Sequence, residues 1–477
     1  MDKARVPAPS AGMIPLGREG STYGDRIDHL LGARLCRPRD TRREPTSAIG
    51  AFELHRSADR GIWMKIEQAS LQRRGALVRA TATVHWEDVS RPSQPIYYEV
   101  PAEYASYVAA LPEAFLTLAT LPAMRLGETR VAIEGEICPE LSEGLQESMA
   151  WIARWNPRRR PVRLDVDVGC SHSQAASKGE RRVAGSLLSG GVDGLALLRL
   201  NHDLYPPGHP RHIDFALVVR GLWDVEADEV PDAEARLQRA AEALRSIARD
   251  ADITVVPVFT NLHNLSDADM PFWHHEYQGA ALASFGHVFA PRLEVLSLAS
   301  TWTVENLEVW GSHPVLDHNY GTHDLAIRHE MATWSRPAKL KLLANWPTAL
   351  SSLRVCNRQP EADLNCGRCE KCVRTMLGLL GMGVLDQATT FEFDDLTPRQ
   401  LHKIVVTHPA VAGDYRETAA LLRTIGRDDL AVAIERRLRL SPVLRQGRRI
   451  RSTLKHLDDR YFDGAVSRLR HRSRGDG

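Results

Sequence analysis

The sequence has no excess of charge of either sign. Its 61 Lys and Arg residues are balanced by 60 Asp and Glu residues, which leaves a formal net charge of +1. Nucleic-acid-binding domains usually carry a basic excess, so the overall charge does not indicate such a partner. With 43% hydrophobic and 25% charged residues, the composition is typical of a globular protein, and 477 residues are enough for two or three domains.

Long apolar runs are also missing. The most apolar stretch, residues 107–124, is interrupted by Pro112, Glu113 and Pro122, whereas a membrane-spanning helix needs about 20 mostly apolar residues. Residues 1–20 contain no apolar core of the kind found in secretory signal peptides. We therefore expect a cytoplasmic protein without a membrane partner.

Two common phosphate-binding motifs are absent around the glycine-rich turn Ser189-Gly190-Gly191-Val192-Asp193-Gly194. This turn has neither the G-x-x-x-x-G-K-[ST] pattern nor the third glycine of the dinucleotide fingerprint. An apolar run precedes it and helical spacing follows it, which predicts a strand, a tight turn and a helix. Unpaired amides at a helix start, approached over glycines, favour a phosphate ligand. A purely structural turn, with Asp193 as the helix cap, is the alternative.

Sequence patterns divide the chain into five parts: an arm (1–46), an α+β domain (47–160), an α/β domain (161–385), a helical region (386–440) and a basic tail (441–477). For the α+β domain they predict strands near 62–66, 77–86, 96–100 and 130–137, and helices near 102–111 and 139–155. For the α/β domain they predict strands near 162–168, 215–221, 253–258 and 293–299, and helices near 233–248 and 277–289. Such alternation is typical of a parallel sheet with crossover helices.

Four of the seven cysteines, Cys356, Cys366, Cys369 and Cys372, are crowded into one short segment. The C-x2-C-x2-C spacing, with a fourth thiolate from upstream, allows all four side chains to converge on one ion. This pattern predicts a metal site rather than disulfides. Structural zinc and an iron-sulfur cluster both use such spacing, so the metal stays open on spacing alone.

A helix start near Ser335 supplies candidate phosphate ligands. Ser335 is a good cap and Pro337 suits the first turn. From this helix Arg336 and Lys339 could neutralise the phosphates of ATP and the leaving pyrophosphate. Ordinary surface cations on an amphipathic helix are the alternative.

The turn-rich segment 312–324 is a candidate substrate loop, in which we single out Ser312, His313 and Asp317. A surface loop with ordinary hydrogen-bonded histidines is an equally good interpretation. A zinc site made by His313, His318 and His323 is disfavoured, because no metal-ligand spacing such as H-E-x-x-H occurs nearby.

The glycine-rich turn resembles the SGGxDS pyrophosphate loop of the N-type ATP pyrophosphatase (PP-loop) superfamily, with Gly194 in place of the serine. With the downstream cysteines, which run into a helix as Cys-Gly-x-Cys-x-x-Cys, residues 182–383 resemble the 7-cyano-7-deazaguanine synthase (QueC) family. The resemblance implies a Rossmann-like parallel sheet of the adenine nucleotide alpha hydrolase type, and zinc on the four cysteines. The N-terminal α+β domain and the C-terminal region lie outside it.

The resemblance also implies a site for ATP and Mg²⁺. The phosphates would bind Ser189, Gly190, Gly191, Val192, Asp193 and Gly194. Adenine would lie against the strand that carries Val219 and Arg220. Asp193 would cap the helix and help to hold the metal, and with Arg336 and Lys339 it would form the catalytic group.

The implied reaction is an ATP-dependent, pyrophosphate-releasing ligation. A carboxylate or amide is adenylated, and ammonia or an amine then displaces AMP. The acceptor is a small molecule or a carboxylate of a peptide or protein. Two alternatives stay open: a thiolation enzyme acting on tRNA or a small molecule, and a non-catalytic, zinc-stabilised nucleotide-binding module. The basic tail could contact nucleic acid or an acidic partner, and a homo-oligomer stays open too.

Overall fold

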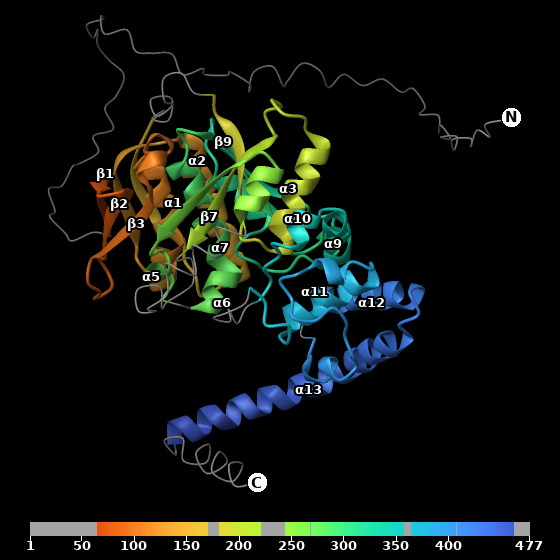
Figure 1. Ribbon diagram of the computed structural model, residues 1–477. Helices are drawn as coiled ribbons and strands as arrows, with labels where there is room; N and C mark the ends of the chain where they lie inside the picture. The colour runs from red at the N-terminus through yellow and green to blue at the C-terminus, as the bar shows by residue number, and fades with distance from the viewer. Residues whose placement is uncertain are drawn as a thin grey trace, which may run out of the picture. The chain divides into compact units, whose positions relative to one another are not determined.

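A ten-stranded, mostly parallel β-sheet carries the fold (Figure 1), in the order β10-β9-β6-β7-β8-β3-β2-β1-β4-β5. The computed structural model describes residues 64–169, 181–220, 244–267, 269–356, 364–406 and 408–461. These residues all belong to one compact unit, Asp59–Gly477. The predicted arm (1–46), most of the predicted helix at 233–248 and the end of the basic tail lie outside the described residues.

The strands are β1 (Lys65–Arg74), β2 (Leu77–His85), β3 (Gln94–Pro101), β4 (Arg130–Ile137), β5 (Arg163–Val168), β6 (Val183–Leu187), β7 (Ile213–Arg220), β8 (Thr254–Thr260), β9 (Leu293–Ala299) and β10 (Ala326–Glu330). The helices are α1 (Pro112–Leu126), α2 (Pro139–Trp155), α3 (Val192–Leu204), α5 (His263–Ser266), α6 (Met270–Phe272), α7 (Gln278–Val288), α8 (Pro314–Asp317), α9 (Arg336–Ala344), α10 (Pro347–Leu350), α11 (Glu370–Gly381), α12 (Pro409–Thr424) and α13 (Asp428–Tyr461). Shorter turns are η1 (Ala102–Tyr107), the π-helical η3 (Trp273–Tyr277), η4 (Val304–Asn306), η5 (His318–Tyr320), η6 (Leu385–Gln387) and η7 (Gln400–Lys403).

The sheet separates two hydrophobic cores, and β7 shows how. Phe215 and Leu217 belong to the core shared with α1, α2 and α7. Their neighbours Ala216 and Val218 belong to the core shared with α3, α9 and α11. Successive side chains of a strand point to opposite faces, so a strand covered on both faces is apolar throughout. The prediction of an α/β protein with a parallel sheet is confirmed at this level.

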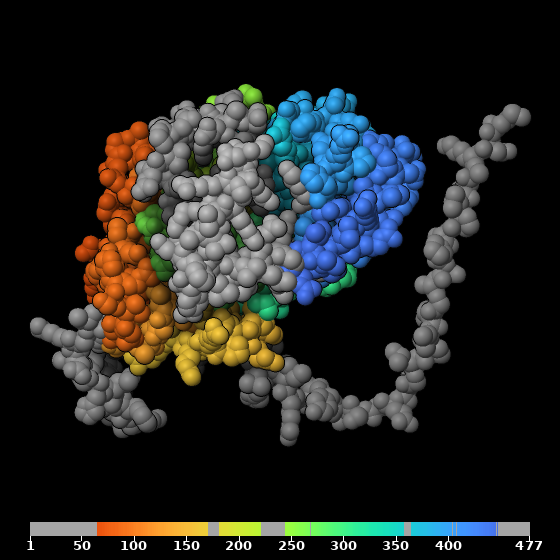
Figure 2. Space-filling model, turned by 90° about the horizontal axis from the view of Figure 1, so that it is seen from below, coloured from red at the N-terminus to blue at the C-terminus, as the bar shows by residue number. Residues whose placement is uncertain are grey.

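The second core continues into the C-terminal helices. Leu422 of α12 and Leu430 of α13 are buried in it together with Met376 of α11. Figure 2 shows the C-terminal part of the chain in blue. Within it, α12 packs against α13. The helix α13 runs through the predicted boundary at 440/441, so the first part of the predicted basic tail continues this helix.

The sheet does not divide at residue 160, where the sequence patterns place a domain boundary. Strand β3 pairs antiparallel with β8 through Tyr98 and Thr260. The side chain of Asn261 extends this junction: it accepts from the amide of Tyr97 at 3.0 Å and donates to the carbonyl of Pro95 at 2.7 Å. The predicted α+β and α/β domains therefore form one continuous sheet.

Most predicted elements are confirmed, but one helix is not where the sequence patterns place it. Instead of a helix near 102–111, the chain forms η1 and then the buried helix α1. Proline at the first position of α1 and Gly127 in the left-handed conformation after its end explain these bounds. Pro122 is accommodated inside the helix, although its position in the sequence favours a break. No helix in the described ranges has the length and apolar character needed to cross a bilayer.

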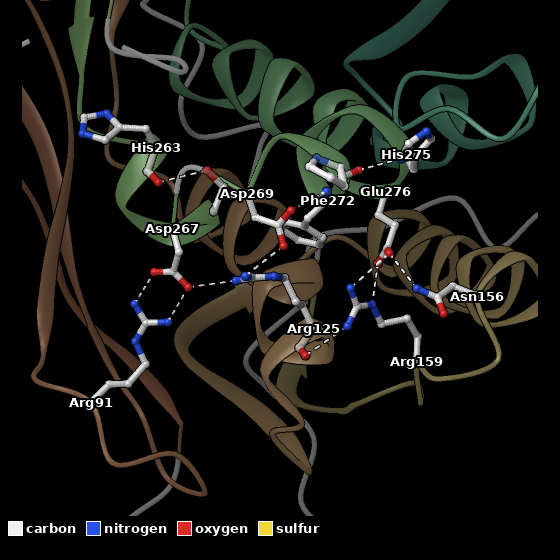
Figure 3. Close-up of polar contacts among 12 residues, drawn as sticks. Arg91, Arg125, Asn156, Arg159, His263, Asp267, Asp269, Phe272, His275 and Glu276 are labelled. Atoms are coloured by element: carbon white, nitrogen blue, oxygen red, sulfur yellow. Dashed lines mark hydrogen bonds and ion pairs between the residues drawn. The ribbon is translucent and has the colours of Figure 1, made fainter. Parts of the chain in front are cut away.

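A network of ion pairs fastens the segment 267–276 to the N-terminal half of the chain (Figure 3). The Asp267 carboxylate accepts from both Arg91 and Arg125, at distances of 2.5 to 2.8 Å. The Arg159 Nε donates to Glu276 Oε2 at 2.6 Å, and the Asn156 amide donates to Oε1 of the same carboxylate at 2.9 Å. Arg159 thus lies in a largely buried pair rather than in the solvated hinge that its arginine-rich neighbourhood suggests.

We expect Glu276→Gln to lower the free energy of unfolding by about 2 kcal/mol, between the values typical of exposed and of fully buried pairs. The substitution keeps the shape of the side chain but leaves Arg159 without its counter-charge. Glu435→Gln is the matched control, because the Arg423–Glu435 pair is about 40% exposed on both sides and should contribute less than about 1 kcal/mol. Denaturant unfolding measures both variants, and equal losses would contradict the assignment.

Candidate functional site

The point where the chain reverses its direction of travel across the sheet marks the candidate site. Strand β6 lies between β7 and β9; the chain proceeds from β6 through β7 to β8 and then returns to β9 and β10 on the other side. In open parallel sheets, ligands bind outside the carboxyl ends of the strands at such a reversal. The glycine-rich turn joins the carboxyl end of β6 to α3 at this place, so the predicted strand, turn and helix are confirmed.

The turn is fixed by backbone contacts. Gly190 has φ of +75°, a left-handed conformation that favours glycine. Its carbonyl accepts from the amide of Arg354 at 2.8 Å, and Ser189 Oγ accepts from the amide of Gly191 at 3.3 Å. A Cβ on Gly190 would find ordinary contacts only, so the conformation rather than space requires glycine here.

Asp193 is not the cap of α3, contrary to the prediction. The cap position is Gly191, without a side-chain hydrogen bond, and Asp193 lies in the first helical turn. Its Oδ1 accepts from Lys339 Nζ at 2.9 Å, and its Oδ2 lies 3.8 Å from Arg336 Nη1. Burial alone would raise the pKa of Asp193, but the positive charges of Lys339 and Arg336 outweigh it and hold the pKa below its ordinary value.

Gly194, which replaces the serine of the PP-loop pattern, lies against the end of β6. A Cβ at this position would be 3.3 Å from the carbonyl oxygen of Leu187. That distance is tight for a side chain, so glycine lets the start of α3 lie close to the strand. The amide of Gly194 remains part of the first helical turn.

A cavity of about 330 Å³ opens at the carboxyl ends of β6, β7 and β9. Apart from the metal ligand Cys356, the predicted site residues that line it are Ser189, Gly191, Val192, Asp193, Gly194, Val219, Ser312 and Arg336. Gly190, Arg220, Lys339, His313 and Asp317 are not among its lining residues. Lys339 is fully buried behind Asp193 and also donates to the carbonyl of Ser300 at 2.5 Å.

Cations dominate the charged lining of this cavity. Arg336, Arg354 and Lys371 face it, whereas Asp193 is the one acid among the described residues that line it. The Arg336 Nε is buried without a hydrogen-bond partner among the described residues, and buried donors are normally paired. Loss of hydration inside the site, followed by the charge of Arg336, lowers the pKa of Lys371. Such a lining suits an anionic ligand that supplies the missing acceptors.

The four clustered cysteines come together as the spacing predicts. Their sulfur atoms all lie within 4.8 Å of one another, with separations of 3.4 Å for Cys369–Cys372 and 4.0 Å for both Cys356–Cys369 and Cys366–Cys372. Four thiolates at about 2.3 Å from a tetrahedral zinc ion are about 3.8 Å apart. The cluster can therefore hold a metal such as zinc.

Local backbone features hold the metal site beside the cavity. Cys356 lines the cavity as well as the cluster. Asn365 Oδ1 accepts from the amides of Val355 and Cys356 at 2.8 and 3.2 Å, and the amide of Cys369 donates to Cys366 Sγ at 3.3 Å. Gly367 takes a left-handed φ of +61° between two of the ligands. The segment that leads into α11 thus holds three of the four thiols, and Cys372 joins them from the first turn of that helix.

The three residues predicted to bind substrate form hydrogen bonds within their own loop, at 312–317. Asp317 is fully buried and accepts from Ser312 Oγ at 2.7 Å and from the amide of His313 at 3.2 Å. His313 Nδ1 accepts from the amide of Val315, and burial lowers the pKa of His313. Ser312 alone of the three lines the cavity. The structure does not bring His313, His318 and His323 together in one metal-binding group.

Sequence reasoning missed Lys371 and Arg354. Lys371 stands inside the cysteine motif, where attention falls on the metal ligands, and Arg354 lies two residues upstream of Cys356. Both residues lie close to the metal ligands in the sequence, and the metal site lies beside the edge of the sheet. These two facts together could have indicated that Lys371 and Arg354 face the cavity. Comparisons of the chain with protein-family models, curated proteins and solved structures give no match. The functional argument therefore rests on the geometry of the site.

Proposed function

We propose that the protein is an ATP-dependent, AMP- and pyrophosphate-forming ligase that activates a carboxylate or amide for attack by ammonia or an amine. The observation that supports it best is the convergence of three cations with the glycine-rich turn at the reversal point of a parallel sheet. A triphosphate is bound by backbone amides at a helix start and by positively charged side chains around the leaving group.

In this proposal the acceptor carboxylate attacks the α-phosphorus of ATP. The bond between the α- and β-phosphates breaks, pyrophosphate leaves, and an acyl-adenylate forms. Arg336 and Lys371 offset the charge that develops on pyrophosphate. The amine nitrogen then attacks the acyl carbon, AMP leaves, and the nitrogen loses a proton. Mg²⁺ would be bound by phosphate oxygens and by Asp193, since this ion commonly uses one or two carboxylates together with substrate phosphates.

Zinc in the four-cysteine cluster has a structural role in this proposal. All four ligands are thiolates, which closes the coordination shell and leaves no position for substrate. The same arrangement argues against the thiolation alternative, because among the described residues Cys356 is the one cysteine that lines the cavity, and its sulfur belongs to the cluster. The protein would carry the metal to fix the loop that bears Arg354 and Lys371.

Replacing Lys371 with methionine is expected to weaken ATP binding about tenfold, equivalent to ~1.4 kcal/mol, because one cation of the phosphate subsite is lost. Lys341→Met is the matched control, since Lys341 lies exposed on α9 away from the cavity. Calorimetry measures ATP binding, and pyrophosphate release in the presence of carboxylates and ammonium measures turnover. Unchanged affinity in Lys371→Met would contradict the phosphate subsite.

A non-catalytic nucleotide-binding module is the second candidate. The pairing of Asp193 with Lys339 at 2.9 Å, together with glycine at position 194, favours it, because both reduce the groups free to handle Mg²⁺ and phosphate. This candidate predicts ATP binding that depends on Lys371 without pyrophosphate release from any carboxylate tested. Asp193-dependent release would exclude it.

A further inference from the structure

A second group of potential metal ligands lies at the start of α2, among residues that the proposed ligase site does not use. Cys138 is the cap residue of α2 and is fully buried. Its Sγ lies 3.5 Å from Glu140 Oε2 and 3.6 Å from His323 Nδ1. The three ligand atoms all lie within 4.8 Å of one another.

These separations match a tetrahedral metal site. With about 2.3 Å for a zinc–sulfur bond and about 2.0–2.2 Å for bonds to nitrogen and oxygen, a tetrahedron places sulfur about 3.6 Å from either partner. A thiol, an imidazole and a carboxylate are together the ligand set of a borderline cation such as Zn²⁺. The thiol has a single proton, so a hydrogen bond to Glu140 leaves the contact with His323 to an imidazole N–H that donates to sulfur, whereas one bound cation accounts for both contacts.

The fold brings the histidine to the cysteine by a close helix approach. His323 follows η5, which packs against α2. Gly144 makes this contact possible, because a Cβ there would lie 2.0 Å from the carbonyl oxygen of Asn319. The loop cannot reach this position beside a larger residue. Ligands that are 185 positions apart in sequence are thus held together by packing rather than by flexible side chains alone.

The surroundings give a cation access to the ligands. Glu140 and His323 line a cavity of about 520 Å³, into which Glu143 and Glu147 also face from α2. Glu140 and His323 are exposed, so an ion can enter from solvent and displace the thiol proton. Three protein ligands leave the fourth tetrahedral position to water, as in zinc sites that are open to a substrate.

We propose that Cys138, Glu140 and His323 form a second metal site, which binds a divalent cation of the Zn²⁺ class and keeps one coordination position open toward this cavity. The site is independent of the four-cysteine cluster and of the proposed ligase activity, since it shares no residue with either.

Zinc stoichiometry of the full chain tests the proposal. After dialysis against buffered Zn²⁺, elemental analysis should find about two ions per chain, one in each site. His323→Ala should retain about one ion. His318→Ala is the matched control, because His318 lines the same cavity from the same loop yet its Nδ1 is 2.9 Å from the carbonyl of Pro314; it should retain both.

Cobalt substitution identifies which ion is lost. His323→Ala should keep the intense sulfur-to-cobalt charge-transfer band of the four-thiolate site, whereas Cys372→Ser should lose most of it and keep a weaker band from the single thiolate of Cys138. Both side chains replaced in the histidine variants are exposed, so these variants are expected to fold. One ion in the wild type, or equal losses in His323→Ala and His318→Ala, would overturn the proposal.

Discussion

Replacing Cys372 with serine is expected to abolish metal binding at the four-cysteine cluster and to lower the free energy of unfolding by about 5 kcal/mol. Structural zinc binds small domains with an apparent free energy of about 10–16 kcal/mol at neutral pH. In a larger protein, part of this binding free energy adds to the free energy of unfolding. Cys372 is fully buried in the core that α11 shares with α3 and α9, so the loss should spread beyond the cluster.

Chelator titration, elemental analysis and thermal unfolding measure this effect. Cys138→Ser removes another fully buried thiol and serves as the comparison: it should keep the ion of the four-cysteine cluster and lose the one proposed at Cys138, Glu140 and His323. If elemental analysis finds iron and inorganic sulfide in the purified protein, the cluster holds an iron-sulfur centre rather than zinc. A Cys372→Ser variant that keeps the metal of the four-cysteine cluster together with its stability would contradict the site altogether.

Replacing Asp193 with asparagine is expected to lower the free energy of unfolding by about 3 kcal/mol and to abolish pyrophosphate release. Removing one partner of a buried pair typically costs about 3–5 kcal/mol, because the remaining charge is left uncompensated. Here that charge is on Lys339, whose side chain is 1% exposed, while Asp193 is 27% exposed at the cavity. The substitution therefore affects both the core and the proposed site.

The double variant Asp193→Asn/Lys339→Met separates the two effects. Removing both charges should restore most of the stability, as commonly happens when a buried pair is replaced by apolar groups, but it should not restore pyrophosphate release. Recovery of both properties would show that Asp193 serves only to neutralise Lys339. Urea unfolding and the release assay, run on the wild type, Asp193→Asn and the double variant, distinguish these outcomes.

The Asp193 pair also predicts a dependence of stability on pH. The pKa of this carboxyl is lowered in the folded protein, so the unfolded state binds the proton more tightly. The stabilisation is then fully present above the unfolded pKa of about 3.9 and is lost as pH falls through the lower folded value. The difference in stability between wild type and Asp193→Asn should accordingly shrink in acid.

The elements of the site could be predicted where the signal is local. The turn at 189–191 and the cysteine spacing each follow from neighbouring residues, and both occur as expected. The partner of the Asp193 carboxylate, by contrast, is a lysine 146 positions away. No local pattern records that contact, and Asp193 lies in the first turn of α3 rather than at its cap.

The sequence patterns do not predict that the two halves form one continuous sheet, because the strand pairing that joins them is long-range. Strands β1 to β3 form a local antiparallel meander that looks complete in the sequence. Strand β8 pairs in parallel with β7 on one side and antiparallel with β3 on the other. Neither the alternation of strands and helices nor the helix spacing predicts the second pairing. In the same way, the buried Asp317 has a partner twelve positions further along the chain, His329, whose Nδ1 lies 2.8 Å from Asp317 Oδ2.

The junction of β3 with β8 has a consequence for the order of folding. Tyr98 and Thr260 are paired although they lie 162 positions apart in the sequence. Closing so long a loop costs entropy before any contact stabilises it, which lowers the folding rate. During synthesis the meander emerges first and must wait with the β3 edge unpaired until β8 leaves the ribosome. An exposed edge of this kind recruits other strands. Hydrogen exchange on refolding chains should therefore protect the amides of β1 and β2 well before those of β8.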